Sequence, residues 1–311
     1  MQNTQRGMTP NDPATANGSD APTAPARETA CLVNFGDLLR EFGDDAQAAN
    51  EAQISGVPRG PISGLRGLDC ELSGAWLPGL HWIHGNAGAG KTAFALQVAA
   101  MCGTPALFVT CEMSPVELLR RHTARATSTF LGRLKSGELT RRDAEKLARD
   151  AIATAPRLAI ADATRAGAPL QFLRDAAQIV KGDDRHILVV VDSLHSWALR
   201  LASGLSEYEA LNVAIADLQM LAHSLKCPIL VVSERNRDSM KSGGLNAGAG
   251  TRKIEYSGET VIDLHRDGDT KQDGAGEVPI KLTLSKNRHG ATGKPLDLRF
   301  NGALQRFTEP K

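Results

Sequence analysis

The eight residues Gly85–Thr92 constrain the fold of this chain more than any other segment. Their sequence, GNAGAGKT, fits G-x-x-x-x-G-K-[ST], in which glycines let the backbone curl so that successive N–H groups point at an anion. The lysine of this pattern places a charge beside the β- and γ-phosphates of a nucleotide, and the threonine hydroxyl can bind Mg²⁺. We therefore predict a phosphate-binding segment made of Gly85, Asn86, Ala87, Gly88, Ala89, Gly90, Lys91, Thr92 and Ala93.

The segments on either side of this loop support the prediction. Gly79–His84 has the pattern of a buried strand, and Thr92–Ala100 has the pattern of a helix. A helix in this position directs its N-terminal dipole at the phosphates. The context therefore favours nucleotide binding over the alternative, a glycine-rich turn that happens to carry a lysine.

Short apolar runs alternate with helical patterns along the chain, which is typical of a parallel sheet with crossover helices. A final pair of runs, joined through Gly290 and Gly293, predicts antiparallel strands that close one edge. We therefore predict an α/β fold with a mostly parallel central sheet. Beyond Gly79–His84, the predicted strands are Ala106–Cys111, Arg157–Ala161, Ile187–Asp192, Pro228–Ser233, Val261–His265, Pro279–Ser285 and Leu296–Phe300.

Composition excludes several other classes of protein. The 311 residues carry a formal net charge of +1, so a nucleic-acid surface would have to be local. The five cysteines form no C-x-x-C pair, which favours buried thiols in a reducing compartment. We find neither a signal peptide nor an apolar run of membrane-spanning length. We expect a cytoplasmic protein that does not enter a membrane.

Three regions follow from composition. Residues 1–28 have almost no large apolar residues, which predicts a disordered tail. Residues 29–53 include an amphipathic helix between Cys31 and about Glu51 that would dock on the core or on a neighbouring chain. Residues 54–311 show no long linker, so we expect one nucleotide-binding domain there.

Asp192 ends the apolar run Ile187–Asp192, which predicts a central strand. The carboxyl ends of such strands face the ligand crevice, where a carboxylate can hold Mg²⁺ directly or through water. The alternative is an aspartate that caps a helix or forms a turn. Because a phosphate loop precedes it, we favour the magnesium role for Asp192, together with Thr92.

Glu112 follows a second predicted strand, immediately before a helix predicted to begin at Ser114, with Pro115 in its first turn and Glu117 completing a capping box. Hydrolysis needs a base that orients and deprotonates the attacking water near the γ-phosphate. Glu112 is the candidate base. Its alternative role is only a favourable charge near a helix N-terminus.

Further charged residues follow the later strands. Glu234 lies at the polar end of the run Pro228–Ser233, where it could sense the γ-phosphate. Lys286 and Arg288 are two residues apart, so both would face the same side of an extended strand. They are either ordinary edge-strand charges or cationic fingers that reach the triphosphate of a neighbouring subunit.

In this order, these motifs resemble the C-terminal RecA-like motor domain of DnaB-type replicative helicases, over about residues 54–308. The resemblance is carried by Gly85–Ala100, Cys111-Glu112-Met113-Ser114, Val190–His195, Ser233–Arg237, His265-Arg266-Asp267 and Ser285–Gly293, and also by Leu134–Leu139 and Phe300–Phe307. The phosphate loop alone is shared by many ATPases, whereas the Glu-Met-Ser step with the Lys-x-Arg hairpin is much more specific.

The resemblance implies a homo-oligomeric ring, such as a hexamer, with ATP and Mg²⁺ bound between subunits. Lys91, Thr92 and Asp192 would act in cis with Glu112 as base, and Lys286 and Arg288 would act in trans. Loops lining the channel would hold single-stranded DNA by its phosphates. In this chain Arg237, Lys241, Arg252 and Lys253 could supply those contacts.

Four features depart from the family pattern. Only some 50 residues precede the motor, so the family's N-terminal helical domain is not expected. Glu234 and His195 stand where glutamines are usual, and His195 is either functional or merely a polar residue at a strand end. Residues 242–253 are rich in glycine and alanine and lack the family's Arg-Glu-x-Gly stretch.

We predict a Mg²⁺-dependent ATPase that couples hydrolysis to movement on single-stranded DNA. The alternative is a RecA- or KaiC-like regulatory switch that acts on a protein partner without helicase activity. Glu234 and the altered loop favour the switch, whereas Glu112 with Lys286 and Arg288 favours the motor.

Overall fold

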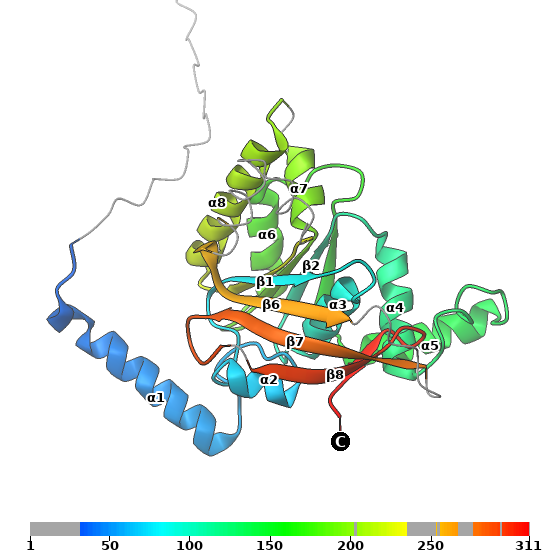
Figure 1. The fold of residues 1–311 in the computed structure, drawn as a ribbon, viewed down its shortest axis with the longest axis horizontal. Coiled ribbons are helices and arrows are strands. Elements are labelled where there is room, and N and C mark those ends of the chain that lie inside the picture. Colours follow the sequence, from blue (N-terminus) through cyan, green and yellow to red (C-terminus); the bar gives the residue numbers. More distant parts are fainter. Residues whose placement is uncertain are drawn as a thin grey trace, which may run out of the picture. The chain divides into compact units, whose positions relative to one another are not determined.

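A nine-stranded sheet forms the centre of the protein (Figure 1). The computed structural model describes residues 32–201, 204–234, 253, 256–266, 276–292 and 294–310. Within them the strand order is β3-β2-β4-β5-β1-β6-β7-β8-β9. The strands are β1 (Gly79–Gly85), β2 (Ala106–Thr110), β3 (Leu158–Asp162), β4 (Leu188–Asp192), β5 (Pro228–Val232), β6 (Gly258–Arg266), β7 (Glu277–Asn287), β8 (Pro295–Asn301) and β9 (Arg306–Thr308).

Strands β1 to β6 pair in parallel, and β7 to β9 add an antiparallel edge next to β6. All eight predicted strands are present, and the α/β class with a mostly parallel sheet is confirmed. Some predicted ends were wrong: β2 stops at Thr110, so Cys111 belongs to the following loop, and β6 begins three residues earlier, at Gly258. The short edge strand β9 was not predicted.

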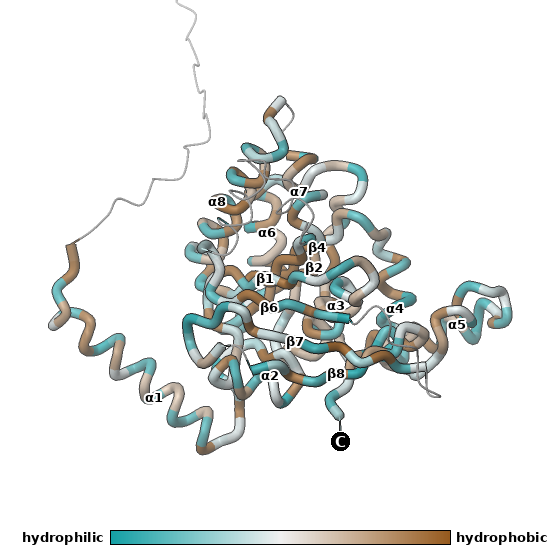
Figure 2. The backbone as a smooth tube through the Cα atoms, viewed as in Figure 1, coloured by the Kyte–Doolittle hydropathy of each residue, from teal (hydrophilic) through white to brown (hydrophobic). Residues whose placement is uncertain are grey.

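Helices cover both faces of the sheet, which explains why its central strands are apolar throughout. In β4, Leu188 and Val190 pack in one core cluster, with α2 and α3, whereas Val189 and Val191 pack in the other, with α6, α7 and α8. Figure 2 shows this apolar character in the central strands. The helices are α2 (Arg66–Glu71), α3 (Lys91–Met101), α4 (Pro115–Thr127), α5 (Arg141–Thr154), α6 (Leu170–Lys181), α7 (Leu194–Leu201) and α8 (Glu207–Leu225).

Helix α4 begins as predicted, with Ser114 as N-cap and Pro115 in the first turn. The Ser114 hydroxyl accepts a hydrogen bond from the Glu117 backbone N–H at 3.3 Å. The predicted return bond of a capping box was wrong. The Glu117 carboxylate instead pairs with Lys135 at 2.6 Å and with Arg121 at 3.3 Å.

The N-terminal segment forms a 3-10 helix (Phe35–Leu38) followed by α1 (Leu39–Ser55). A helix was predicted here, although the observed one starts later in the segment. Large apolar side chains are exposed along it, namely Leu32, Phe35, Leu39 and Phe42. The chain divides into two compact units, 1–47 and 48–311. The predicted tail (1–28) lies outside the described residues, and the docking of residues 29–53 stays a prediction.

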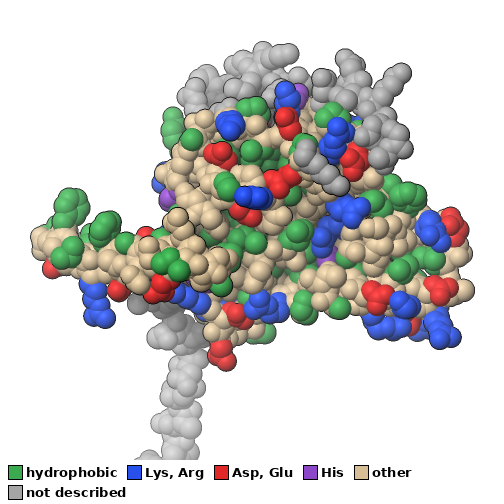
Figure 3. All heavy atoms as spheres, turned by 90° about the horizontal axis from the view of Figure 1, so that it is seen from below, with side chains coloured by type: hydrophobic (Ala, Val, Ile, Leu, Met, Phe, Trp, Pro, Cys, Tyr) green, Lys and Arg blue, Asp and Glu red, His purple; other side chains and the backbone are tan. Residues whose placement is uncertain are grey.

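The described surface agrees with the near-neutral composition. On the face displayed in Figure 3, cationic and acidic side chains are interspersed. Within the described part of the chain, no helix is both long enough and apolar enough to cross a membrane.

Candidate nucleotide-binding site

The predicted phosphate loop lies between the end of β1 and the start of α3. The Lys91 ammonium donates hydrogen bonds to the backbone carbonyls of Gly85 at 2.9 Å and Asn86 at 3.4 Å. Its side chain therefore folds back over the loop, where a bound phosphate would meet it. Gly90 caps α3 with a φ of 86°, and Gly88 has a φ of 76°.

Two glycines of the loop have steric reasons to be glycine. A Cβ at Gly85 would lie 2.7 Å from the Leu264 carbonyl oxygen of β6, a backbone atom that cannot move aside. A Cβ at Gly90 would lie 2.9 Å from the Phe307 ring, and its positive φ also disfavours other residues. The motif pattern therefore reflects the close approach of β6 and β9 to the loop.

Asp192 ends β4 and is 4% exposed. Burial raises the pKa of its carboxyl to about 6, and the nearby Glu112 charge adds to the rise. A hydrogen bond from the Thr92 side chain and the charge of Lys91 oppose it. The two predicted magnesium-binding residues are thus in contact, and Lys91 lies close enough to influence them.

Glu112 follows β2, the strand that pairs with β4 so that Thr110 lies opposite Asp192. The loop is tied to β4 because the Cys111 backbone N–H donates to the Asp192 carbonyl at 2.8 Å. The Glu112 carboxylate oxygen Oε1 accepts hydrogen bonds from the hydroxyls of Ser193 at 2.5 Å and Ser196 at 2.8 Å. Glu112 therefore lies at the same edge of the sheet as Asp192, as predicted.

Glu234 is exposed, two residues beyond the end of β5. Its neighbour Ser233 is buried, and the Ser233 N–H donates to the Ile83 carbonyl of β1 at 3.0 Å. Because β5 lies between β4 and β1, Glu234 shares the carboxyl edge with the phosphate loop. His195 is half-buried in α7, and its Nδ1 is buried without a hydrogen-bond partner among the described residues.

Lys286 and Arg288 lie at the end of β7, away from the phosphate loop. Both side chains donate to the Tyr256 carbonyl, at 3.1 and 3.3 Å, so they reach the same side of the strand as predicted. Arg288 also pairs with the Glu259 carboxylate at 3.3 Å, and His289 contacts the same carboxylate at 3.0 Å. Within a single chain, the contacts of Lys286 and Arg288 given above are with Tyr256 and Glu259 rather than with the phosphate loop.

Of the predicted DNA contacts, Lys253 is the one within the described residues. Its ammonium donates to the Asn212 carbonyl of α8 at 3.2 Å. Arg237, Lys241 and Arg252 lie outside the described residues, as does most of the glycine-rich stretch 242–253.

Sequence reasoning missed three residues at this site. Ser193 and Ser196 bind Glu112, and Arg121 of α4 lowers the pKa of Asp192 as one of the weaker influences on it. Ser193 could have been predicted at the site, because it directly follows Asp192 in the sequence. Nothing in the sequence pattern placed Arg121 or Ser196 near the site.

The donor set fits a nucleotide with Mg²⁺. A carboxylate and a hydroxyl, from Asp192 and Thr92, are oxygen ligands of the kind that Mg²⁺ prefers, and Lys91 supplies a phosphate-binding cation. Among the described residues, no three His, Cys, Asp or Glu side chains gather as a protein-only metal site.

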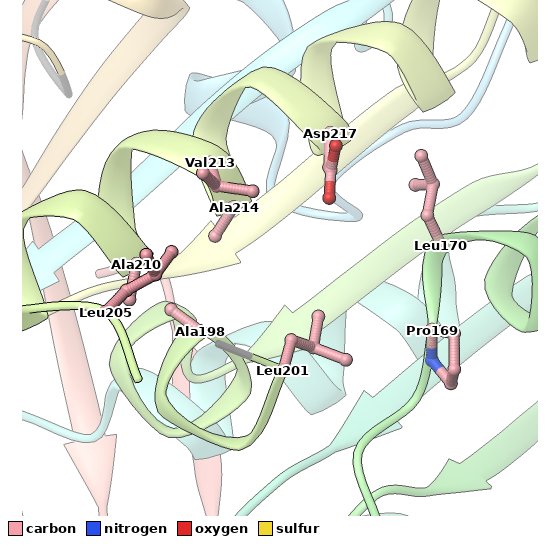
Figure 4. Close-up of a pocket in the computed structure, with 9 residues that line it drawn as sticks. All are labelled: Pro169, Leu170, Ala198, Leu201, Leu205, Ala210, Val213, Ala214 and Asp217. Carbon is pink, nitrogen blue, oxygen red and sulfur yellow. The ribbon is translucent and has the colours of Figure 1, made fainter. Parts of the chain in front are cut away.

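A separate hollow of about 260 Å³ lies between the start of α6, α7 and α8 (Figure 4). Its walls are mainly apolar and include Leu170, Leu201 and Val213, with Asp217 as the charged member. Burial raises the pKa of Asp217. None of the predicted nucleotide-binding residues lines this hollow.

A phosphate loop after β1, with acidic residues after β2 and at the end of β4, defines a P-loop nucleotide-binding domain with a RecA-like fold. The chain belongs to the DnaB-like helicase C-terminal domain family, whose model matches residues 60–309. The suspected resemblance is confirmed.

Two curated relatives illustrate the match. The chain is 24% identical over 285 residues to the replicative DNA helicase DnaB of Geobacillus stearothermophilus, covering 86% of this chain and 60% of the relative. It is 27% identical over 237 residues to a probable plasmid replicative DNA helicase of Chlamydia psittaci, covering 71% of this chain and 49% of the relative. The chain thus spans about half to three-fifths of these relatives.

Solved structures share the fold. A DnaB-like replicative helicase, solved in a study of its interactions with primase, aligns with a TM-score of 0.71 at 19% identity, covering 90% of this chain and 68% of that one. A separately solved ATPase domain aligns with a TM-score of 0.70 at 18% identity, covering 86% of this chain and 98% of that one. A KaiC-like protein from Pyrococcus horikoshii aligns with a TM-score of 0.53 at 19% identity, covering 81% of this chain and 99% of that one. The alternative of a KaiC-like switch is not favoured, because the matching family is the DnaB-like one.

Proposed function

We propose that this chain hydrolyses ATP with Mg²⁺ and uses the reaction to move on single-stranded DNA, as the motor of a cytoplasmic DnaB-type helicase. The observation that carries the proposal is the meeting of Lys91, Thr92, Asp192 and Glu112 at one edge of the sheet, in a chain of the DnaB-like family. The curated relatives named above are a replicative DNA helicase and a probable plasmid replicative DNA helicase, which supports DNA as the substrate.

Each residue has a role that its chemistry allows. The loop Gly85–Ala93 cradles the phosphates, Lys91 binds the β- and γ-phosphates, and Thr92 and Asp192 hold the metal. Bound Mg²⁺ neutralises negative charge on the phosphates. Glu112 accepts a proton from the attacking water while the new oxygen–phosphorus bond forms and the bond to the ADP oxygen breaks.

The site is completed, in this proposal, by a second copy of the chain in a ring. Lys286 and Arg288 would reach the triphosphate of the next subunit, as head-to-tail contacts in a closed ring permit. Arg288 would first leave the Glu259 carboxylate, which would keep its contact with His289. Glu234 would sense the γ-phosphate, and Arg237, Lys241, Arg252 and Lys253 would contact DNA phosphates.

Two variants test the hydrolytic part of the proposal. Lys91→Ala is expected to lose nucleotide binding, whereas Glu112→Gln is expected to bind ATP normally and to lose at least about a hundredfold in turnover. Turnover is measured by phosphate release, and binding with a fluorescent ATP analogue. Normal turnover by Glu112→Gln would remove Glu112 from the role of base.

A further inference from the structure

One oxygen of the Glu112 carboxylate is held by two hydroxyls. Oε1 accepts from Ser193 Oγ at 2.5 Å and from Ser196 Oγ at 2.8 Å, and the two hydroxyl oxygens are 3.3 Å apart. Among the described residues, Oε2 has no hydrogen-bond partner. The two donors use the two lone pairs of Oε1, so Oε2 is the oxygen left to accept a proton.

The hydroxyls come from a rigid part of the protein. Ser193 is 3% exposed and directly follows Asp192. Ser196 lies on α7, where the fully buried Trp197 donates from its indole nitrogen to the Ala168 carbonyl at 2.9 Å. The Glu112 loop is itself joined to β4 through the bond from Cys111 N–H to the Asp192 carbonyl. Both sides of the contact are therefore fixed to the sheet.

We propose that Ser193 and Ser196 are positioning residues that turn Oε2 of Glu112 toward the attacking water. The inference rests on the proposed function, because it assigns partners to the proposed base. A free carboxylate on a surface loop samples many orientations, and holding a base in the reactive one lowers the barrier. The contact also couples the base to the metal site, since Ser193 immediately follows Asp192.

The same two contacts could instead slow hydrolysis, and the experiment below distinguishes this effect from positioning. If the serines instead hold the base away from the water, their removal would speed hydrolysis. The positioning proposal requires that removal slow it. The sign of the change in kcat therefore decides between the two.

The test compares kcat and KM for ATP in Ser193→Ala, Ser196→Ala and Ser196→Thr. Each alanine variant is expected to lose about tenfold in kcat, the effect of one hydrogen bond to a charged group, with KM little changed. Ser196→Thr keeps the hydroxyl and is expected to recover most of the loss. Ser224→Ala serves as the matched control, because it removes a hydroxyl on α8 whose one hydrogen bond within the described part of the chain goes to the Leu221 carbonyl of the same helix.

A second measurement guards against a purely structural effect of the buried Ser193. In a Glu112→Gln background, Ser193→Ala and Ser196→Ala are each expected to cause no further loss, because both serines act through the carboxylate. An unchanged or raised kcat in Ser196→Ala, or an equal loss in both backgrounds, would overturn the proposal. Full turnover by Glu112→Gln alone would instead overturn the base assignment, so the two failures are distinguishable.

Discussion

At the scale of single residues, the site keeps a carboxylate where burial disfavours its charge. Asp192 is 4% exposed and its pKa is raised from 3.8 to about 6, mainly by burial. The charged form of Asp192 is therefore less stable in the folded state than in water. The free energy by which this charge destabilises the folded state applies fully above about pH 6. Such a cost is expected where a metal, when bound, supplies the missing partner charge.

This predicts that Asp192→Asn stabilises the nucleotide-free protein at pH 7.5 while it abolishes hydrolysis. The gain is about 1–3 kcal/mol, because the raised pKa is a direct measure of the penalty on the charged form. It should fade as the pH falls from about 6 towards 4. Thermal unfolding of both proteins in EDTA at several pH values measures the gain. A variant that is less stable than the wild type at pH 7.5 would contradict it.

The buried His81 predicts an opposite dependence on pH. Burial lowers its pKa from 6.5 to about 4, and its ring lies between the Thr260 hydroxyl at 2.9 Å and the Leu77 carbonyl at 2.7 Å. The unfolded chain takes up a proton at a higher pH than the folded one. The neutral, buried His81 therefore contributes fully to the free energy of unfolding above pH 6.5. As the pH falls towards 4, this contribution is lost, which lowers the free energy of unfolding by about 3 kcal/mol.

Replacing this histidine isolates its effect from that of other groups. Between pH 7 and pH 4.5, His81→Asn should lose less free energy of unfolding than the wild type does, as measured by urea denaturation. The comparison concerns the change with pH, since the substitution itself also costs stability. Equal losses in the two proteins would rule out this account of His81.

Much of the site could be predicted from single residues because their chemistry is local. Glycines with positive φ, a lysine and a threonine lie next to one another in the phosphate loop, and Asp192 ends an unbroken apolar run. Ser196 and Arg121 could not be predicted. They reach the site through the placement of α7 and α4, which depends on tertiary packing.

At the scale of elements, long apolar strands were predictable and the short edge strand was not. Strand β9 has three residues and no pattern of its own. A helix side chain completes its pairing: Gln97 donates to the Phe307 carbonyl at 3.0 Å and accepts from the Phe307 N–H at 2.8 Å. Gln97 is 3% exposed, so this amide acts as a buried substitute for a neighbouring strand.

The pairing predicts a large cost for Gln97→Ala. The substitution leaves a buried N–H and a buried carbonyl without partners, which should cost about 2–4 kcal/mol. Gln171→Ala is the control: this exposed glutamine on α6 bonds to Asp175 within its own helix at 2.8 Å, and its loss should cost less than about 0.5 kcal/mol. Thermal melts compare the two variants. Similar stabilities would contradict the role of Gln97.

At the scale of the whole molecule, we propose that the site is divided between two copies of the chain. Lys91 belongs to the phosphate loop, whereas Arg288 contacts Glu259 and Tyr256 in the single chain. If Arg288 acts on the next subunit, an active site forms wherever an intact phosphate loop meets an intact arginine. The intact Lys91 and the intact Arg288 then come from two neighbouring chains, so no single chain needs to carry both.

Mixing two inactive variants tests this division. Lys91→Ala and Arg288→Ala should each hydrolyse little ATP alone, but rings assembled from an equal mixture should recover activity at about a quarter of their interfaces. The control mixes Arg288→Ala with the double variant, which provides no intact interface. If the first mixture remains as inactive as the control, Arg288 does not act in trans.

The central claim is that ATP hydrolysis drives movement on single-stranded DNA. Its most direct test is ATP turnover with and without single-stranded DNA, at increasing salt, beside a mass measurement in ATP and Mg²⁺. We predict an oligomer whose turnover rises severalfold with DNA, by an amount that falls as salt weakens the phosphate contacts. A monomer, or turnover that DNA leaves unchanged at every salt concentration, would contradict the claim.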